Sequence, residues 1–236
     1  MGSGLGAINQ MGPFIYSLTS DGMNNVYVGG TFGTAGGVAT TNIAKWDGTN
    51  WSALGPGLRG ARVRPLASDG DGNVYASAAS NSVSKWDGNS WSSFGSSPIE
   101  SLGGLYAEVI ALEANDDGIL YAGGSFSTAG GKPANNIAKW DGNSWSALSS
   151  GMNRDVHSLV LGPSGTLYSG GTFSSAGDVP VNGIAKWDGN LWSALGSGMN
   201  GLGVDVRALA LNGAGDLYAA GRFSAAGGVP ASNIAK

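Results

Sequence analysis

The sequence predicts an all-β protein made of repeated four-stranded antiparallel sheets, and three observations support this prediction. The stretch Asn42–Gly48, which reads Asn-Ile-Ala-Lys-Trp-Asp-Gly, recurs along the chain and is followed closely by a second Trp in each full copy. A tyrosine that follows an apolar residue also recurs, at a spacing of about 48 residues. No segment sustains the 3.6-residue apolar period of a helix, whereas short alternating runs separated by Gly, Asp and Asn are frequent.

Five repeat units fill the 236 residues. The copies of the Trp-Asp-Gly stretch lie at Asn42–Gly48, Val83–Gly88, Asn136–Gly142 and Gly183–Gly189, with a shortened fifth copy at Asn233–Lys236. The recurring tyrosines are Tyr27, Tyr75, Tyr121, Tyr168 and Tyr218, which lie 48, 46, 47 and 50 residues apart. Because all-β folds of this length are often single domains, we expect residues 1–236 to form one domain.

Each unit is expected to form four strands, and the fourth unit shows the pattern most clearly. Its strands are predicted at Val156–Leu161, Thr166–Phe173, Gly183–Trp187 and Leu191–Leu195. A tight turn at residues 162–165 joins the first two strands, a long loop at residues 174–181 joins the second to the third, and Asp188-Gly189-Asn190 joins the last two.

A four-stranded meander repeated every ~40–50 residues is typical of a β-propeller blade. The sequence therefore predicts a five-bladed β-propeller. The fifth blade is expected to lack its outermost strand, because Lys236 precedes the Trp-Asp-Gly turn. The open edge of that blade is a candidate surface for self-association, since unpaired strand edges are templates for another strand.

The repeats also resemble those of a known class of propellers. The residues that carry the resemblance are the Tyr-x-Gly-Gly of Tyr121–Gly124, the Ala-Gly-Gly of the long loop, and the Trp-Asp-Gly turn with its following Trp. Over nearly the whole chain the pattern is similar to kelch or galactose-oxidase-type blades, and to the repeats of fungal cortical polarity-marker proteins and bacterial surface propeller proteins. The resemblance implies a binding or adhesion role outside the cell or at its surface. Kelch rings usually have six or seven blades, so five units depart from that family.

Composition narrows the classes of partner. The formal net charge is −4 and no basic patch is visible, so we do not expect nucleic-acid binding. The chain contains no run of 18 apolar residues that would span a membrane, and no cysteine for disulfides or thiolate chemistry. It also contains no pattern of a signal peptide.

The candidate ligand-binding residues stand where the first strand of each unit begins. Successive strands alternate in direction, so both kinds of long connection are expected at that end, and loops on a rigid scaffold often carry function. The first strand is innermost in this blade type, which places its start at the mouth of the central channel. The least repeated polar residues of the chain stand here: Tyr16, Arg62, Arg64, Glu108, Asp155, His157, Asp205 and Arg207.

Two interpretations of these residues remain open. They form a binding site for a protein or glycan on the face that carries the long loops, or they are ordinary ion pairs around a wet channel. Glu108, Asp155 and Asp205 are expected to form an acidic cluster that attracts a cation or the neighbouring arginines. A metal site of these carboxylates with His157 would require several blades to converge.

Other recurring residues have simpler structural interpretations. The paired tryptophans, Trp140 with Trp145 for example, are expected to pack between blades rather than to stack on sugars. The recurring lysines are expected at blade edges. Asp69-x-Asp71-x-Asn73 resembles the start of a calcium loop, but Ser80 stands where that loop needs a carboxylate.

We therefore predict a non-catalytic binding or surface-adhesion module, without catalytic residues, metal or cofactor. A carbohydrate-binding lectin propeller is the alternative, and a metal-dependent enzyme at the channel mouth is the third reading. With one histidine and no cysteine, no nucleophile has an evident base.

Overall fold

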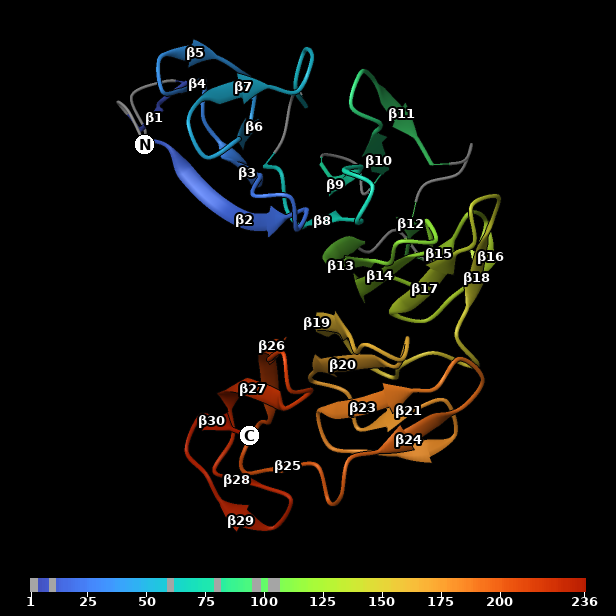
Figure 1. Cartoon of the computed structure of the whole chain (residues 1–236). Helices are drawn as coiled ribbons and strands as arrows, with labels where there is room; N and C mark the ends of the chain where they lie inside the picture. The colour runs from blue at the N-terminus through green and yellow to red at the C-terminus, as the bar shows by residue number, and fades with distance from the viewer. Residues whose placement is uncertain (1–3, 9–11, 59–61, 79–81, 95–98, 102–106) are drawn as a thin grey trace. The chain divides into compact units, whose positions relative to one another are not determined.

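The computed structural model describes residues 4–8, 12–58, 62–78, 82–94, 99–101 and 107–236, and these residues form strands and turns without a helix (Figure 1). The chain divides into two compact units. The first comprises Met1–Pro98 with Ala114–Gly118, and the second comprises Ile99–Glu113 with Ile119–Lys236. Within the described residues, no helix is long and apolar enough to cross a membrane.

The first unit contains two four-stranded antiparallel sheets. In the first sheet, neighbouring strands follow chain order: β2 (Phe14–Ser20), β3 (Val26–Thr31), β6 (Ile43–Trp46) and β7 (Trp51–Ala53). The second sheet has the same order: β8 (Leu66–Ser68), β9 (Val74–Ser77), β10 (Val83–Trp86) and β11 (Trp91–Ser93). Both sheets are the meanders that the repeat pattern predicts.

The second unit contains two more four-stranded sheets and one three-stranded sheet. The four-stranded sheets are β13 (Glu108–Ala114), β14 (Leu120–Ser125), β17 (Ile137–Trp140) and β18 (Trp145–Ala147), then β19 (Val156–Leu161), β20 (Leu167–Gly171), β23 (Ile184–Trp187) and β24 (Trp192–Ala194). The third sheet is β26 (Asp205–Leu211), β27 (Leu217–Arg222) and β30 (Ile234–Ala235). The sequence predicts three strands in this last repeat, and the sheet has three.

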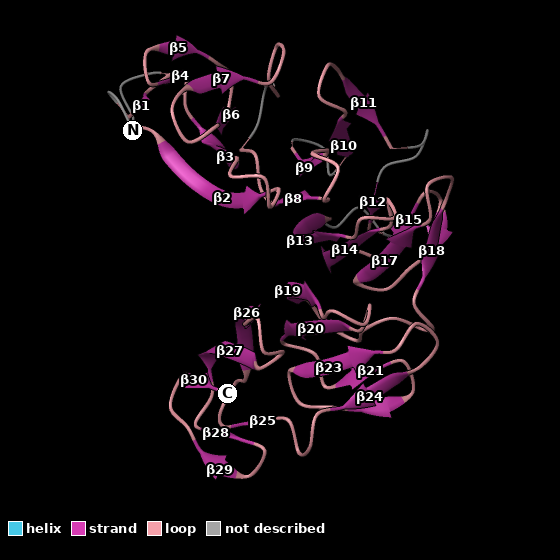
Figure 2. Ribbon diagram, viewed as in Figure 1, coloured by secondary structure: helices cyan, strands magenta, loops and turns pink. Residues whose placement is uncertain are grey.

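The long connection predicted at residues 174–181 joins the second and third strands, and it contains a small hairpin that the sequence analysis did not predict. Its two strands are β21 (Ser175–Ala176) and β22 (Val179–Pro180), and the magenta arrows of Figure 2 show this hairpin beside its sheet. Gly177 has φ +57° in the two-residue turn between them. A tight hairpin turn of this kind requires positive φ, which glycine adopts without strain.

Three other repeats contain the same hairpin, and the chain segment that precedes each sheet pairs with it. The hairpins are β4 (Thr34–Ala35) with β5 (Val38–Ala39), β15 (Thr128–Ala129) with β16 (Lys132–Pro133), and β28 (Ala225–Ala226) with β29 (Val229–Pro230). Their partners are β1 (Leu5–Gly6), β12 (Ile99–Glu100) and β25 (Met199–Asn200), and Met152 bridges to Ala176 in the same way. Both kinds of long connection therefore meet at one end of each of these sheets, as predicted. In the second repeat, the short connection includes residues 79–81, which lie outside the described residues.

The Gly-Gly pair of the first, third and fourth repeats makes room for the neighbouring first strands. A Cβ at Gly170 would lie 2.7 Å from Val206 Cγ1, in the first strand of the next sheet. A Cβ at Gly171 would lie 2.1 Å from the main-chain oxygen of Asp155, in the preceding connection of its own sheet. The first glycine thus admits the apolar side chains of the next sheet, and the second admits a close approach of backbone.

The tryptophans of the fourth strands are part of the core, as predicted. Trp145 and Trp192 are 3% and 5% exposed, and the indole Nε1–H of Trp192 donates to the Leu148 main-chain oxygen at 3.0 Å. Tyr121 is buried as well, whereas Trp140 is only half-buried. Buried rings of this kind are not available to stack on a sugar.

Candidate functional site

Three of the eight candidate site residues lie on β-bulges in the first strands of their sheets. The pairing of β2 with β3 shifts register between Ile15 and Ser17, that of β19 with β20 between Val156 and Ser158, and that of β26 with β27 between Val206 and Ala208. The extra residues are Tyr16, His157 and Arg207, three of the residues that the sequence singles out. A bulge adds a residue that the ladder does not pair, and it changes the direction of that side chain.

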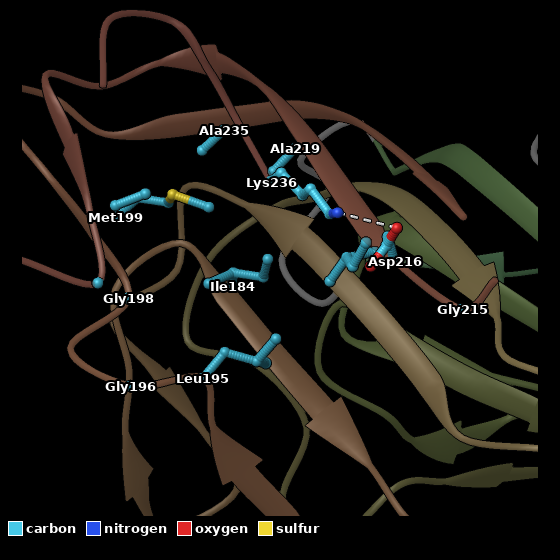
Figure 3. Close-up of a pocket in the computed structure, with 13 residues that line it drawn as sticks. Ile184, Leu195, Gly196, Gly198, Met199, Gly215, Asp216, Ala219, Ala235 and Lys236 are labelled. Carbon is cyan, nitrogen blue, oxygen red and sulfur yellow. Dashed lines mark ion pairs between the residues drawn. The ribbon is translucent and has the colours of Figure 1, made fainter. Parts of the chain in front are cut away.

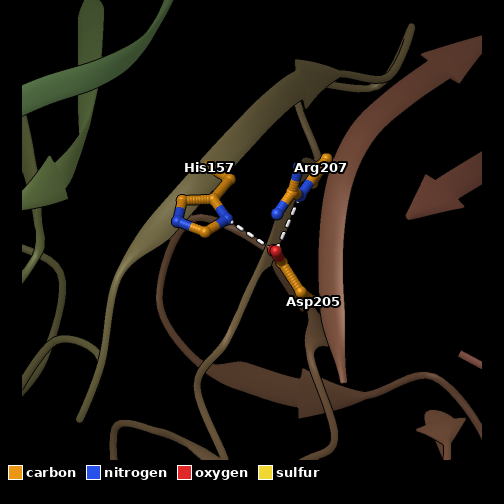
Figure 4. A network of polar contacts seen from close by, with 3 residues as sticks. All are labelled: His157, Asp205 and Arg207. Carbon is orange, nitrogen blue, oxygen red and sulfur yellow. Dashed lines mark hydrogen bonds and ion pairs between the residues drawn. The ribbon is translucent and has the colours of Figure 1, made fainter. Parts of the chain in front are cut away.

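In the second unit, one bulge residue reaches the next sheet. His157 Nδ1 of β19 lies 2.6 Å from Asp205 Oδ1, at the start of β26 (Figure 4). The Nε–H of Arg207, two residues further along β26, donates to Asp205 Oδ2 at 2.7 Å. The Asp205 carboxylate thus contacts the imidazole of β19 with one oxygen and the guanidinium of Arg207 with the other.

The electrostatics of this cluster favour an ionised Asp205. Burial alone would raise the pKa of Asp205, whose side chain is largely covered, but the hydrogen bonds from Arg207 and His157 outweigh it and lower that pKa. An ionised carboxylate only accepts hydrogen bonds, so His157 Nδ1 carries the proton of the shared bond. The Arg207 side chain is 74% exposed, so its guanidinium faces solvent although its Nε is held by Asp205.

The first unit carries the equivalent positions with different chemistry. The guanidinium carbons of Arg62 and Arg64 lie 5.8 Å and 5.6 Å from the centre of the Tyr16 ring. Phe14 stacks on Tyr16 with ring centres 6.4 Å apart. Here an aromatic bulge residue meets two arginines of the segment that precedes β8, at distances typical of cation–π contacts. The predicted site residues therefore include side chains that contact one another between neighbouring repeats in both units.

The remaining predicted residues occupy the same strand starts. Glu108 is exposed at the start of β13, and Asp155 is half-buried just before β19, where its main-chain oxygen accepts the N–H of Thr172. The carboxylate of Asp205 is occupied by His157 and Arg207. Within the described part of the chain, no three His, Asp or Glu side chains lie close enough together to hold a metal ion.

Glu113 of β13 is a polar residue that the sequence interpretation missed. At the equivalent position of their first strands, the other repeats have uncharged residues: Thr19, Ala67, Val160 and Ala210. Glu113 Oε1 accepts the Leu161 N–H of β19 at 2.9 Å. Burial raises its pKa to about 7, and this single hydrogen bond only partly opposes the shift. An acidic residue where the other repeats have uncharged ones is the signal in the sequence that could have identified Glu113.

The Asp-rich turn of the second repeat is structural. Asp69 Oδ1 accepts the N–H groups of Asp71 and Asn73, and Asp69 Oδ2 accepts hydrogen bonds from the Asn73 amide and the buried Tyr75 hydroxyl. Asp21 makes the same bonds in the first repeat, with Tyr27 as the buried partner. These carboxylates organise the turn and accept the hydrogen bond of a buried tyrosine hydroxyl.

The recurring lysines lie at the third strands, with two kinds of contact. Lys45 and Lys85 lie over the rings of Tyr27 and Tyr75, at 5.8 Å and 5.6 Å from the ring centres. Lys236 instead forms an ion pair with Asp216 at 3.0 Å (Figure 3). The expectation of lysines at blade edges is wrong for the four-stranded sheets, where the third strand lies between the second and the fourth. Only Lys236 follows a strand at the end of its sheet, β30.

Comparison with known proteins gives the fold. No family model matches the chain, and no curated protein matches it by sequence. Among solved structures, it is similar to YCF48 bound to D1 peptide, with 13% identity, a TM-score of 0.52, and coverage of 92% of this chain and 66% of that one. The catalytically inactive H270A virginiamycin B lyase from Staphylococcus aureus with quinupristin matches at 13% identity and a TM-score of 0.55, covering 93% and 67%.

A third similar structure is the computationally designed Ika8 protein, at 19% identity and a TM-score of 0.54, with coverage of 91% of this chain and 57% of that one. This chain thus spans about two thirds or less of the length of these structures. YCF48 and the lyase are β-propeller proteins. Together with the repeated four-stranded sheets, the likeness shows an all-β fold of the propeller type.

Proposed function

We propose that this chain is a non-catalytic peptide-binding module, and that its five repeats are five blades of one propeller. The binding residues are those at the starts of the first strands. The observation that carries the proposal is the His157–Asp205–Arg207 cluster, in which non-repeated polar residues on bulges meet between neighbouring sheets. The rest of the scaffold repeats closely, so variation at this one row favours a ligand over a purely structural role.

The chemistry of the cluster favours an acidic group on the peptide. Arg207 is fixed in direction by the bond from its Nε to Asp205, while most of its side chain is exposed. The terminal N–H groups of a guanidinium are arranged to donate two parallel hydrogen bonds to one carboxylate. We infer that an Asp or Glu side chain, or a C-terminal carboxylate, docks on Arg207.

The structural neighbours agree with a peptide as the ligand. The YCF48 structure contains a bound D1 peptide, and it shares only the fold with this chain. The lyase shows that the same fold also serves enzymes, so the fold alone does not decide between the classes. The resemblance of the repeats to surface propeller proteins supports a place outside the cell or at its surface, which is part of the same proposal.

The experiment is a binding screen on an array of 15-residue peptides in which acidic residues are present or replaced by amides. We expect the wild-type chain to bind a subset of acidic peptides, and Arg207→Ala to weaken that binding at least tenfold. Lys186→Ala is the matched control, because Lys186 is an exposed cation of the same unit on β23. If peptide binding is absent, or is the same for wild type and Arg207→Ala, the proposal is wrong.

A further inference from the structure

The turn between β2 and β3 departs from the other repeats at two adjacent positions. It reads Asp-Gly-Met-Asn-Asn over residues 21–25, where the second repeat has Asp-Gly-Asp-Gly-Asn over residues 69–73. Asn24 has φ +68°, and the glycines at this position of the other four repeats have φ between +76° and +83°. Positive φ is strained for residues other than glycine, although Asn tolerates it better than most. The first turn thus keeps the backbone of the others without their glycine.

Met23 is the second departure. Its counterparts in the other repeats are all smaller: Asp71, Asp117, Ser164 and Ala214. Met23 is 54% exposed, and its Cε lies 3.3 Å from the position that a Cβ at Gly72 would take. The side chain therefore reaches across to the turn of the second repeat. A long apolar side chain that is half-exposed adds little to the core, and it lies at the wall of a cavity.

This cavity has a volume of about 370 Å³ and is lined by residues of the first two sheets. Its apolar lining is Met23, Leu54 and the ring of Trp86. Leu54 is 2% exposed, and Trp86 Cζ3 lies 3.0 Å from where a Cβ at Gly55 would be, so the ring of the second sheet covers the end of the first. The volume is near the lower end of the ~300–1,000 Å³ range of ligand pockets, so the cavity suits a small molecule.

Two charged groups of the lining have capacity for a ligand. Lys45 Nζ lies 5.8 Å from the centre of the Tyr27 ring, and within the described residues it forms no ion pair and donates no hydrogen bond. The Asp71 carboxylate is exposed and, in the same part of the chain, accepts no hydrogen bond. The third charge, Asp21, is already taken up, because its two oxygens accept four hydrogen bonds from its own turn and the Tyr27 hydroxyl.

The chemistry of the lining selects a ligand that carries both charges. A simple anion would meet the carboxylates of Asp21 and Asp71, and a simple cation would meet the ammonium group of Lys45. A neutral apolar molecule would cover charged groups without pairing them, which costs free energy. A molecule with a carboxylate, an ammonium group and an apolar side chain matches all three parts of the lining. An internal residue of a peptide lacks both charges.

We propose that this cavity binds a free α-amino acid with a large apolar side chain. The carboxylate of the ligand pairs with Lys45, its ammonium group pairs with Asp71, and its side chain packs against Met23 and the Trp86 ring. The flexible thioether of Met23 adapts to side chains of different shape, so aromatic and branched aliphatic amino acids both fit. The cavity contains none of the residues at the starts of the first strands, so it is separate from the peptide site proposed above.

The test is isothermal titration calorimetry of the full chain with L-phenylalanine at pH 7. We expect saturable one-to-one binding with a Kd below about 1 mM. Two analogues separate the charges: L-phenylalaninamide lacks the carboxylate, and 3-phenylpropionate lacks the ammonium group. L-Alanine keeps both charges and lacks the large side chain. Each of the three should bind at least tenfold more weakly than L-phenylalanine, because one part of the lining is left without its partner.

Variants of the protein locate the site. Lys45→Ala and Asp71→Asn should each weaken the binding of L-phenylalanine at least tenfold. Lys85→Ala is the matched control for the first, because Lys85 lies over the Tyr75 ring at 5.6 Å in the same way and does not line the cavity. Asp117→Asn is the control for the second, because Asp117 is the counterpart of Asp71 in the third repeat and lies outside the lining.

The apolar wall is tested by Met23→Ser, since the fourth repeat has Ser164 at the same position of its turn. This variant should weaken the binding of L-phenylalanine several-fold and leave the circular dichroism spectrum unchanged. Met23→Leu keeps most of the apolar area and should bind L-phenylalanine as wild type does.

Three results would overturn the proposal. One is the absence of saturable L-phenylalanine binding up to about 10 mM, ten times the expected limit. Another is equal binding of L-phenylalanine by wild type and by folded Lys45→Ala or Asp71→Asn. The third is equal binding of L-phenylalanine and its two analogues, a comparison that needs only the wild-type protein and so decides the matter if a variant does not fold.

Discussion

His157 of β19 and Asp205 of β26 stand 48 residues apart in the chain, and their side chains meet at 2.6 Å between neighbouring sheets. One repeat separates them, so the contact joins equivalent strands of consecutive repeats. At the equivalent positions of the first unit, Tyr16 lies close to Arg62 and Arg64. Contacts between consecutive repeats thus recur at these positions, while the residue types differ from sheet to sheet.

Replacing Asp205 by Asn should destabilise the protein by about 1–3 kcal/mol at pH 7, since hydrogen bonds to charged groups contribute about that much. Most of this loss is expected from the His157 bond, because the pair with the exposed Arg207 is screened by solvent. The lowered pKa of Asp205 means that its stabilisation is present above the ordinary value of 3.8 and is lost as pH falls through the folded-state pKa.

Urea denaturation at pH 7 and near pH 3 measures this prediction. The difference between wild type and Asp205→Asn should shrink at the lower pH, while Asp178→Asn, an exposed aspartate of the same unit, should match wild type at pH 7. A difference that grows on acidification would contradict the assignment of an ionised, stabilising Asp205.

Glu113→Gln should remove the loss of stability that ionisation of Glu113 causes as pH rises. The folded-state pKa of Glu113 is raised by burial to about 7 from the ordinary 4.5. Ionising this group therefore costs stability, and wild type should lose about 1–3 kcal/mol between pH 5 and pH 8, with little further change above that range. The Gln side chain still accepts the Leu161 N–H and carries no charge, so the variant should be the more stable protein at pH 8.

Thermal unfolding at pH 5, 6, 7 and 8 tests the role of Glu113. Glu100→Gln, at an exposed glutamate of β12, is the control and should leave the pH profile of wild type unchanged. Parallel profiles for wild type and Glu113→Gln would show that Glu113 titrates at its ordinary pKa.

Gly171→Ala should destabilise the protein by about 1–3 kcal/mol or more, the usual range for overpacking. The added Cβ would lie 2.1 Å from the Asp155 main-chain oxygen, so backbone and not a flexible side chain must move. Gly213→Ala is the matched control, because nothing lies within 4 Å of its Cβ position. Equal denaturation midpoints for the two variants would mean that the backbone approach is not constrained.

Two substitutions of Trp192 separate the apolar and the hydrogen-bonding contributions of a fourth-strand ring to stability. Trp192→Phe should cost about 1–2 kcal/mol because the Leu148 carbonyl loses its donor, and Trp192→Ala should cost about 3–5 kcal/mol through the cavity it leaves. Trp46→Phe, at a half-buried third-strand ring, should cost less than Trp192→Phe. Equilibrium unfolding in guanidinium chloride measures the free energy of unfolding of all three variants. A smaller loss of stability for Trp192→Ala than for Trp46→Phe would contradict the burial of Trp192 in the core.

Local patterns in the sequence were enough to predict the repeats, the main strands of each sheet and the set of non-repeated polar residues. The predicted strand Val156–Leu161 has the bounds of β19, and the Trp-Asp-Gly turns fall where predicted, because apolar alternation and turn residues act over a few positions of chain. The same local signals place Tyr16, His157 and Arg207 at equivalent positions of their strands. No local signal shows that each is the extra residue of a bulge.

Which of these residues contact one another depends on how the sheets pack. His157 contacts Asp205 because a bulge changes its direction and the next sheet brings a strand start beside it. Glu113 accepts the Leu161 N–H because β19 lies beside β13. Contacts between residues 48 positions apart depend on the register and packing of whole sheets, which short-range propensities do not encode.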